Sequence, residues 1–139
     1  MILPQIGEEG QKKLCEAKVI VIGAGGPGSP VLMYLSAAGI GNIGFVEYDK
    51  VDLSNLNRQI LYNTTDIGKN KIDITTQRLK SINPEINIIT YIERLSKSNI
   101  LEIIKDYDIV VDGSDNFPTR FLVNDAVVIL NKPHVFGED

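Results

Sequence analysis

The stretch AKVIVIGAGGPGSP, residues 17–30, constrains the fold more than any other part of the sequence. An apolar, β-branched segment runs directly into a glycine-rich turn, and residues with helical spacing follow. Gly23, Gly25 and Gly28 form the pattern G-x-G-x-x-G. In this pattern the first glycine permits a tight turn, the second permits close approach to a phosphate, and the third permits close helix–strand packing. The pattern predicts a nucleotide-binding unit, and a tight turn without a ligand is the weaker alternative.

Short apolar segments alternate with longer segments of helical spacing along the rest of the chain. Strands are predicted at residues 17–23, 42–49, 86–92, 107–114 and 132–137, and helices at 8–17, 29–39, 69–83, 97–105 and 117–130. Continuous apolar strands joined by helices are typical of a parallel sheet covered on both faces. We therefore predict one α/β domain over residues 1–139 with a Rossmann-like parallel sheet. Residues 50–68 form the one long, polar, irregular segment, and such loops are usually functional or mobile.

The composition argues against several classes of function. The 139 residues include 14 Lys and Arg against 18 Asp and Glu, and these charges are mixed along the chain. Clustered positive charge would be typical of nucleic-acid binding, and no apolar run has the length of a membrane span. The single cysteine, Cys15, forms neither an internal disulfide nor a cysteine zinc site. We expect a cytoplasmic protein without nucleic-acid or membrane partners and without zinc in this chain, and we expect Cys15 to be a buried structural thiol.

Acidic residues follow the second predicted strand, which ends in Glu47-Tyr48-Asp49. An acid roughly 20 residues beyond a glycine turn commonly binds ribose hydroxyls in nucleotide-binding domains. Glu47 is the expected ribose ligand, and Asp49 is a second candidate for nucleotide contact.

The segment DLSNLNRQ, residues 52–59, comes next and lies near the expected nucleotide. Arg58 keeps its charge and presents a fork of donors that suits phosphate oxygens. Ser54 and Asn55 have two possible roles, because they could bind ribose or phosphate or could brace the loop itself.

Further charged residues are expected at the same edge of the sheet. DIGKNK brings Lys71 to the start of a helix, and VVDGSDN ends the fourth strand with Asp115 and Asn116. Ligands bind at the carboxyl ends of parallel strands, so an arginine, a lysine and an aspartate converge on one phosphate tail. Cations with a metal-binding carboxylate suit phosphoryl or nucleotidyl transfer. Hydride transfer needs none of these groups, which makes an NAD-dependent oxidoreductase domain the remote alternative.

The motifs GxGGxGS, SNLNRQ, GKNK and SDNFPTR, in this order, resemble the adenylating domain of the ThiF/MoeB/HesA family, relatives of the ubiquitin-activating enzymes. The resemblance covers nearly the whole chain. It implies that Mg-ATP is bound and that the C-terminal glycine carboxylate of a ubiquitin-like sulfur carrier ending in Gly-Gly is adenylated. By this resemblance Gly26 contacts the nucleotide, and Ser54, Asn55 and Arg58 belong to a nucleotide-contacting stretch. Arg58 and Lys71 neutralise the phosphates, and Asp115 binds magnesium with Asn116 beside it.

The sequence also departs from the pattern of this family. Members usually carry an arginine-containing segment before the stretch that resembles ILPQIG. They also continue for about 100 residues more, with a carrier groove, paired CxxC zinc ligands and a reactive cysteine that Cys15 does not match. We expect an incomplete adenylation domain that forms a homodimer, in part to cover apolar surface at residues 117–136. A non-catalytic, truncated homologue is the alternative. Phe117 and Phe121, four residues apart, are expected in a helix core.

Overall fold

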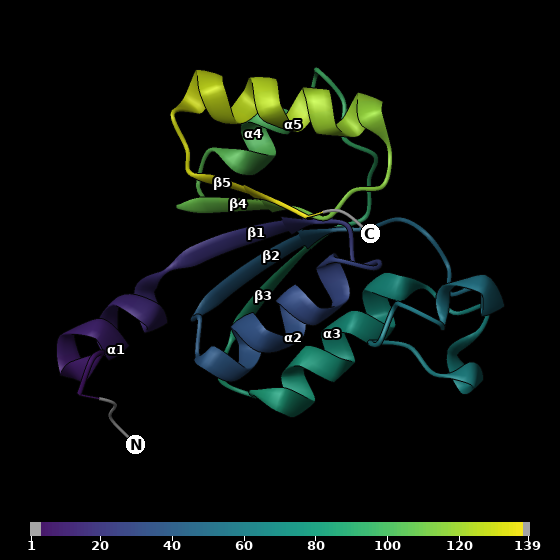
Figure 1. The fold of residues 1–139 in the computed structure, drawn as a ribbon, viewed down its shortest axis with the longest axis horizontal. Coiled ribbons are helices and arrows are strands. Elements are labelled where there is room, and N and C mark those ends of the chain that lie inside the picture. Colours follow the sequence, from purple (N-terminus) through teal and green to yellow (C-terminus); the bar gives the residue numbers. More distant parts are fainter. Residues whose placement is uncertain (1–3, 138–139) are drawn as a thin grey trace.

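Five strands form one parallel sheet in residues 4–137, the part of the chain that the computed structural model describes (Figure 1). The strands are β1 (Lys18–Ile22), β2 (Asn42–Val46), β3 (Asn87–Tyr91), β4 (Ile109–Asp112) and β5 (His134–Phe136). Their spatial order is β3-β2-β1-β4-β5, and every adjacent pair is parallel. The chain therefore builds outward from β1 to one edge and then crosses to β4 on the other side. Ligands of open α/β sheets bind at such a switch point.

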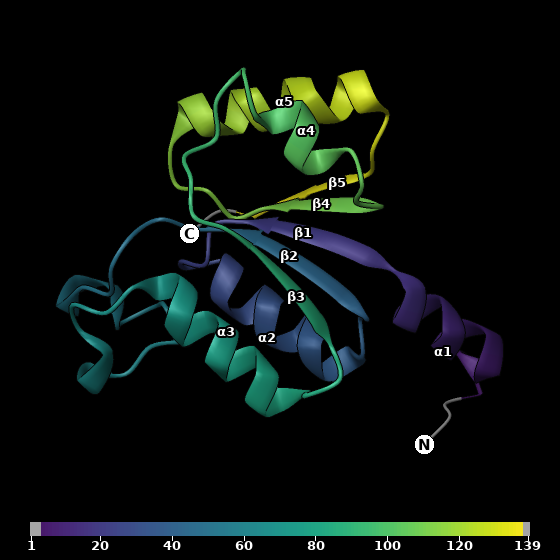
Figure 2. The ribbon, with the colours of Figure 1, turned by 180° about the vertical axis from the view of Figure 1, so that it is seen from behind.

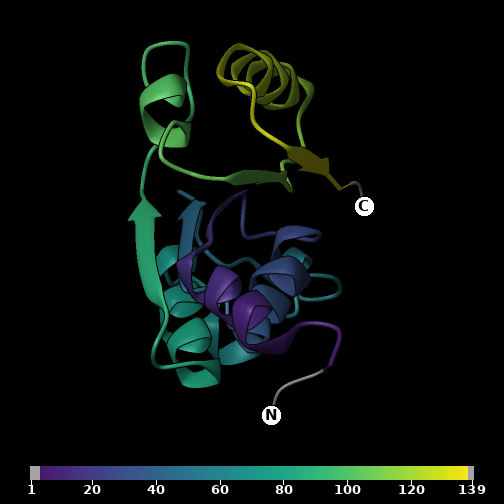
Figure 3. The same cartoon turned by 90° about the vertical axis from the view of Figure 1, so that its left-hand side faces the viewer.

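Helices cover both faces of this sheet. Figure 3 shows α2 (Gly28–Ala38) and α3 (Lys71–Ile82) on one face and α4 (Ile100–Ile104) and α5 (Phe117–Leu130) on the other. The helix α1 (Gly7–Glu16) precedes β1 and lies at the opposite end of the sheet from the carboxyl ends of the strands (Figure 1). These elements confirm the predicted Rossmann-like α/β architecture, with element ends displaced by at most three residues. In residues 4–137 no helix is both long enough and apolar enough to cross a bilayer.

The alternation of side chains along β1 divides the core into two clusters. Val19 and Val21 pack with Leu32 on the side of α2 and α3. Ile20 and Ile22 face the other way and pack with residues of α4 and α5. A strand that is buried on both faces needs an apolar residue at every position, which explains the uninterrupted run KVIVI.

The glycine turn between β1 and α2 has the geometry that its spacing predicts. Gly23 has a φ of 87°, in the left-handed region. A Cβ atom on Gly28 would lie 1.9 Å from the carbonyl oxygen of Gly23. Only glycine therefore allows α2 to begin so close to β1, and the predicted packing role of Gly28 is confirmed.

The segment between β2 and α3 contains two short 3₁₀ helices, η1 (Leu53–Asn55) and η2 (Thr64–Asp66). Figure 2 shows this segment from behind, where it projects beyond the start of α3. Its ends are held together at the base, because Lys71 donates its backbone N–H to the carbonyl oxygen of Asp49 at 3.0 Å. The segment is therefore anchored beside the carboxyl end of β2.

Three expectations about burial are wrong. Cys15 is exposed, because α1 has no buried residue in the described structure. Phe117 and Phe121 stack on each other with ring centroids 6.4 Å apart but are 69% and 67% exposed. Their spacing correctly predicts contact between the rings, but the face of α5 that carries them points away from the sheet.

Candidate functional site

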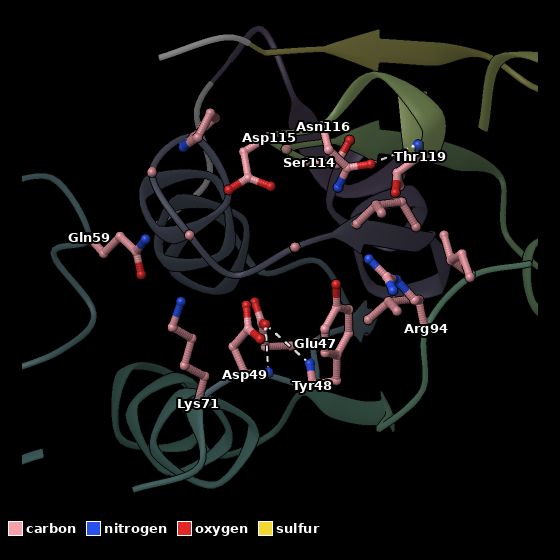
Figure 4. Close-up of a pocket in the computed structure, with 18 of the residues that line it drawn as sticks. Glu47, Tyr48, Asp49, Gln59, Lys71, Arg94, Ser114, Asp115, Asn116 and Thr119 are labelled. Carbon is pink, nitrogen blue, oxygen red and sulfur yellow. Dashed lines mark hydrogen bonds between the residues drawn. The ribbon is translucent and has the colours of Figure 1, made fainter. Parts of the chain in front are cut away.

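A pocket lies at the carboxyl ends of β1, β2 and β4 (Figure 4). Its walls are the glycine turn, the segments after β2 and β3, the start of α3 and the loop between β4 and α5. The residues predicted from sequence that line this pocket are Gly23, Gly25, Gly26, Glu47, Asp49, Arg58, Lys71, Asp115 and Asn116. The fold therefore brings most of the candidate residues together, although they come from five separate segments.

Lys71, the first residue of α3, points into the pocket (Figure 4). It is only 5% exposed, and its ammonium lies 5.7 Å from the centroid of the Tyr62 ring. The ammonium makes no hydrogen bond or ion pair with any residue in the range 4–137. The lysine stem is buried while the ammonium faces the pocket, and a cation there without an anionic partner favours the binding of an anion.

Glu47 lines the pocket, and its carboxylate is tied to the backbone around it. It is 6% exposed, and one carboxylate oxygen accepts the backbone N–H of Ala24 at 2.8 Å. The other oxygen accepts the backbone N–H groups of Tyr48 and Asp49, each at 3.1 Å. The carboxylate thus joins the glycine turn to the segment after β2. Asp49 is exposed and lines the same pocket.

The polar side chains of η1 brace their own loop. Asp52 accepts the backbone N–H of Ser54 at 2.9 Å and its hydroxyl at 2.7 Å, and Asn55 accepts the backbone N–H of Asp52 at 3.0 Å. The bonds from Ser54 hold the pKa of the Asp52 carboxyl below its usual value. Neither Ser54 nor Asn55 lines the pocket; both brace their loop, and their contact with a nucleotide stays a prediction. Arg58 does line it, and its guanidinium donates to the carbonyl oxygen of Ser54 at 3.0 Å and to Asn57 at 3.2 Å.

Gln59 is a pocket residue that sequence reasoning did not single out. It is 5% exposed and lies against the glycine turn, with its side-chain nitrogen 3.3 Å from where a Cβ atom on Gly25 would stand. Its buried carboxamide oxygen has no hydrogen-bond partner in the described part of the chain. The available signal was its place in the SNLNRQ motif, directly after Arg58.

The loop between β4 and α5 is held by three polar side chains. Asp112 is buried and accepts the backbone N–H of Ser114 at 2.9 Å, while Asn116 caps α5 by accepting a backbone N–H of its first turn at 2.9 Å. Arg120 donates through Nε and Nη2 to the carbonyl oxygen of Ser114, at 3.2 and 3.1 Å. Within this fixed loop Asp115 remains exposed and directs its carboxylate into the pocket (Figure 4).

The two ends of the pocket differ in character. Lys71 and Gln59 lie at one end (Figure 4), and Tyr48 and Arg94 lie at the other. The Arg94 guanidinium lies 5.8 Å from the centroid of the Tyr48 ring, and Leu95 lines the pocket beside them. One end therefore suits an anion, and the other offers an aromatic ring, a planar cation and an apolar side chain.

A parallel sheet with a glycine turn at its switch point, and a pocket with charged side chains at its carboxyl edge, defines a Rossmann-like nucleotide-binding domain. Residues 1–138 match the ThiF family, and the chain belongs to that family. It is 57% identical over 137 residues to the sulfur carrier protein adenylyltransferase of Thermus thermophilus. It is also 48% identical over 137 residues to the probable adenylyltransferase/sulfurtransferase MoeZ of Mycobacterium tuberculosis. The matches cover 99% of this chain but 51% and 35% of those relatives.

Solved structures with bound ATP share the fold. The tRNA N6-threonylcarbamoyladenosine dehydratase TcdA of E. coli, in complex with ATP, superimposes with a TM-score of 0.88 at 28% identity, covering 95% of this chain and 55% of TcdA. E. coli MccB with ATP gives a TM-score of 0.85 at 32% identity and covers 92% of this chain and 38% of MccB. The family resemblance inferred from the motifs is confirmed, and the chain spans about half or less of these proteins.

Proposed function

We propose that this chain is the nucleotide-binding part of an ATP-dependent adenylyltransferase that activates a ubiquitin-like sulfur carrier ending in Gly-Gly. The observation that carries the proposal is the Lys71 ammonium, which faces the pocket without an anionic partner among the described residues. A triphosphate would supply that anion beside a glycine turn. The names of the Thermus and Mycobacterium relatives support the reaction class.

The different side chains at the two ends of the pocket indicate how the nucleotide is oriented. The phosphates lie with the glycine turn and Lys71, and the base lies toward Tyr48 and Leu95. The ribose then falls between them, beside the segment after β2. Asp49 is the better ribose ligand of the two acids there, because the oxygens of Glu47 already accept three backbone N–H groups.

The proposed reaction requires little acid–base chemistry from the protein. A carboxylate oxygen of the carrier attacks the α-phosphorus, a new O–P bond forms, and the bond to the β-phosphate breaks to release pyrophosphate. The attacking oxygen is already anionic, so no general base is needed. The residues of this chain then contribute positioning and charge neutralisation. Lys71 holds the phosphates from within the pocket, and Arg58 holds them from the rim, exchanging contacts to its own loop for phosphate oxygens.

Magnesium fits this arrangement through Asp115. Mg²⁺ is usually bound by one or two carboxylates together with substrate phosphates and water rather than by a complete protein cage. Asp115 offers one exposed carboxylate in the pocket, and residues 4–137 contain no group of three or more acidic, histidine or cysteine side chains that could form such a cage. When bound, the ion would offset negative charge on the pyrophosphate leaving group.

The test is ATP–pyrophosphate exchange with Mg²⁺ and a ubiquitin-like carrier ending in Gly-Gly. We expect exchange that depends on the carrier and disappears with a carrier lacking those two glycines. Calorimetric titration with Mg-ATP runs in parallel. Binding without exchange would favour the non-catalytic alternative, and failure to bind ATP would overturn the proposal altogether.

We also propose that the chain forms a homodimer, with α5 and β5 contributing apolar contacts. The exposed apolar side chains of this surface are Phe117, Phe121, Val128, Ile129, Val135 and Phe136. Contiguous exposed apolar patches commonly mark association surfaces. Sedimentation at micromolar concentration should give a dimer, and a strictly monomeric protein would contradict this. The cytoplasmic location stays a prediction.

A further inference from the structure

The buried carboxamide of Gln59 has no structural explanation within the described residues. Buried polar atoms nearly always have a hydrogen-bond partner, and one that lacks a partner lowers stability by about 1–3 kcal/mol. Gln59 is 5% exposed, its carboxamide oxygen is buried, and no hydrogen bond to either side-chain polar atom is present within residues 4–137. Such a group in a pocket wall is expected to have its partner in the ligand-bound state.

The backbone holds Gln59 in place from both sides. Its N–H donates to the carbonyl oxygen of Asn55 at 2.9 Å, and its carbonyl oxygen accepts the N–H of Tyr62 at 3.2 Å. The side chain is then confined by the glycine turn, with its nitrogen 3.3 Å from the Cβ position of Gly25. Residue 59 is therefore fixed before any ligand enters.

The direction of the carboxamide matches the position of Lys71. Figure 4 shows the two side chains facing each other at the same end of the pocket, with the Gln59 oxygen turned toward the ammonium and its nitrogen toward the glycine turn. An amide oxygen accepts hydrogen bonds and an amide NH₂ donates them. One carboxamide can thus accept from an ammonium and donate to a phosphate oxygen at the same time.

We propose that Gln59 positions the nucleotide phosphates, with its oxygen accepting from the Lys71 ammonium and its NH₂ group donating to a phosphate oxygen. This inference rests on the proposed function, since it requires a nucleotide in the pocket. Glutamate could accept from Lys71, but it would offer no donor and would repel the phosphates. Leucine would fill nearly the same space and offer neither group.

Stability and ligand dependence together distinguish a positioning role for Gln59 from a purely structural one. A side chain that only stabilised the fold would lower stability when replaced and would affect every ligand of the pocket alike. Removing an unpartnered buried polar group should leave stability unchanged or raise it. The loss should instead be confined to ligands that carry phosphates.

The experiment compares Gln59→Leu and Gln59→Glu with the wild-type chain, by calorimetric titration with Mg-ATP and by ligand-observed NMR with adenosine. We expect the Kd for Mg-ATP to rise about tenfold in Gln59→Leu, which corresponds to about 1.4 kcal/mol, and further in Gln59→Glu. The Kd for adenosine should change less than twofold, and the Tm should not fall. The matched control is Gln77→Leu, an exposed glutamine of α3 outside this pocket, which should leave all three quantities unchanged.

A double-variant cycle with Lys71→Met adds an independent readout. If the two side chains act through one contact, the effects of Gln59→Leu and Lys71→Met on Mg-ATP affinity should be less than additive. An unchanged Kd for Mg-ATP in Gln59→Leu, or equal losses for Mg-ATP and adenosine, would overturn the inference about Gln59 alone. Failure of the wild-type chain to bind Mg-ATP would overturn the proposed function itself.

Discussion

Replacing Lys71 by methionine should separate folding from nucleotide binding. Methionine keeps most of the length and the apolar character of the lysine stem, and it removes the ammonium. In the protein without ligand, the loss is the contact with the Tyr62 ring at 5.7 Å, a type of interaction worth about 0.5–2 kcal/mol. The ammonium faces the pocket and has no anionic partner among residues 4–137, so its removal breaks no ion pair. The free energy of unfolding should therefore fall by no more than about 2 kcal/mol.

The affinity for Mg-ATP, by contrast, should fall clearly in the same variant. Hydrogen bonds to charged groups contribute about 1.5–3 kcal/mol, and about 1.4 kcal/mol corresponds to a tenfold change in affinity. The Kd for Mg-ATP should therefore rise by roughly 10- to 100-fold, whereas the Kd for adenosine should change little. A loss that grows with the number of phosphates, in the order adenosine, AMP, ATP, would place the ammonium at the phosphate end.

Calorimetric titration gives the affinities, and urea unfolding gives the stability. Lys69→Met is the matched control, because Lys69 lies two residues away, is paired with Asp66 at 4.0 Å and does not line the pocket. The reasoning is refuted if Lys71→Met binds Mg-ATP with wild-type affinity. It is also refuted if the variant is destabilised by more than about 3 kcal/mol, the cost of breaking a buried ion pair, because the ammonium would then already be satisfied in the free protein.

Three further predictions concern the glycine turn and its surroundings. Arg58→Ala should lower carrier-dependent exchange by about 100-fold with an unchanged Tm, and a folded variant with undiminished ATP binding and exchange would contradict the role of Arg58. Gly28→Ala should lower the free energy of unfolding, measured with urea, by about 3 kcal/mol, because the new Cβ would lie 1.9 Å from the carbonyl oxygen of Gly23. Wild-type stability of this variant would show that the turn can accommodate a Cβ atom. Burial raises the pKa of Tyr62 above its usual value, so the stability that depends on its neutral hydroxyl is complete below pH about 10 and is lost as the pH rises further. Urea midpoints from pH 8 to 11 (about the range that spans ordinary tyrosine ionisation) should fall less steeply in Tyr62→Phe, and identical slopes would count against this.

The parts of the fold that depend on local sterics could be predicted from the sequence. Val19 to Ile22 are apolar without alternation, and this predicts a strand buried on both faces. Gly23 and Gly28 are needed for a tight turn and for close packing, so their spacing indicates both the turn and the helix that follows it. Lys71 and Asp115 could be assigned to one site because the carboxyl ends of parallel strands meet at one edge.

Hydrogen-bond satisfaction could not be predicted from the same patterns. Ser54 and Asn55 have side chains that suit either a ligand or their own backbone, and the choice depends on whether η1 forms. Gln59 shows the converse case, because an amide is usually solvated and its burial depends on packing against Gly25. Phe121 is exposed because the sheet meets another face of α5, and helical spacing alone does not identify the face that is covered.

Glu47 has a consequence for how genomes are searched. An acid at the end of the second strand is often taken as a mark of dinucleotide cofactors, yet here that carboxylate joins two backbone segments, because it accepts the N–H groups of Ala24 and Asp49. An acid at this position therefore does not by itself identify a dinucleotide-binding domain. A match over the whole chain, such as that of residues 1–138 to the ThiF family, identifies the class of protein instead.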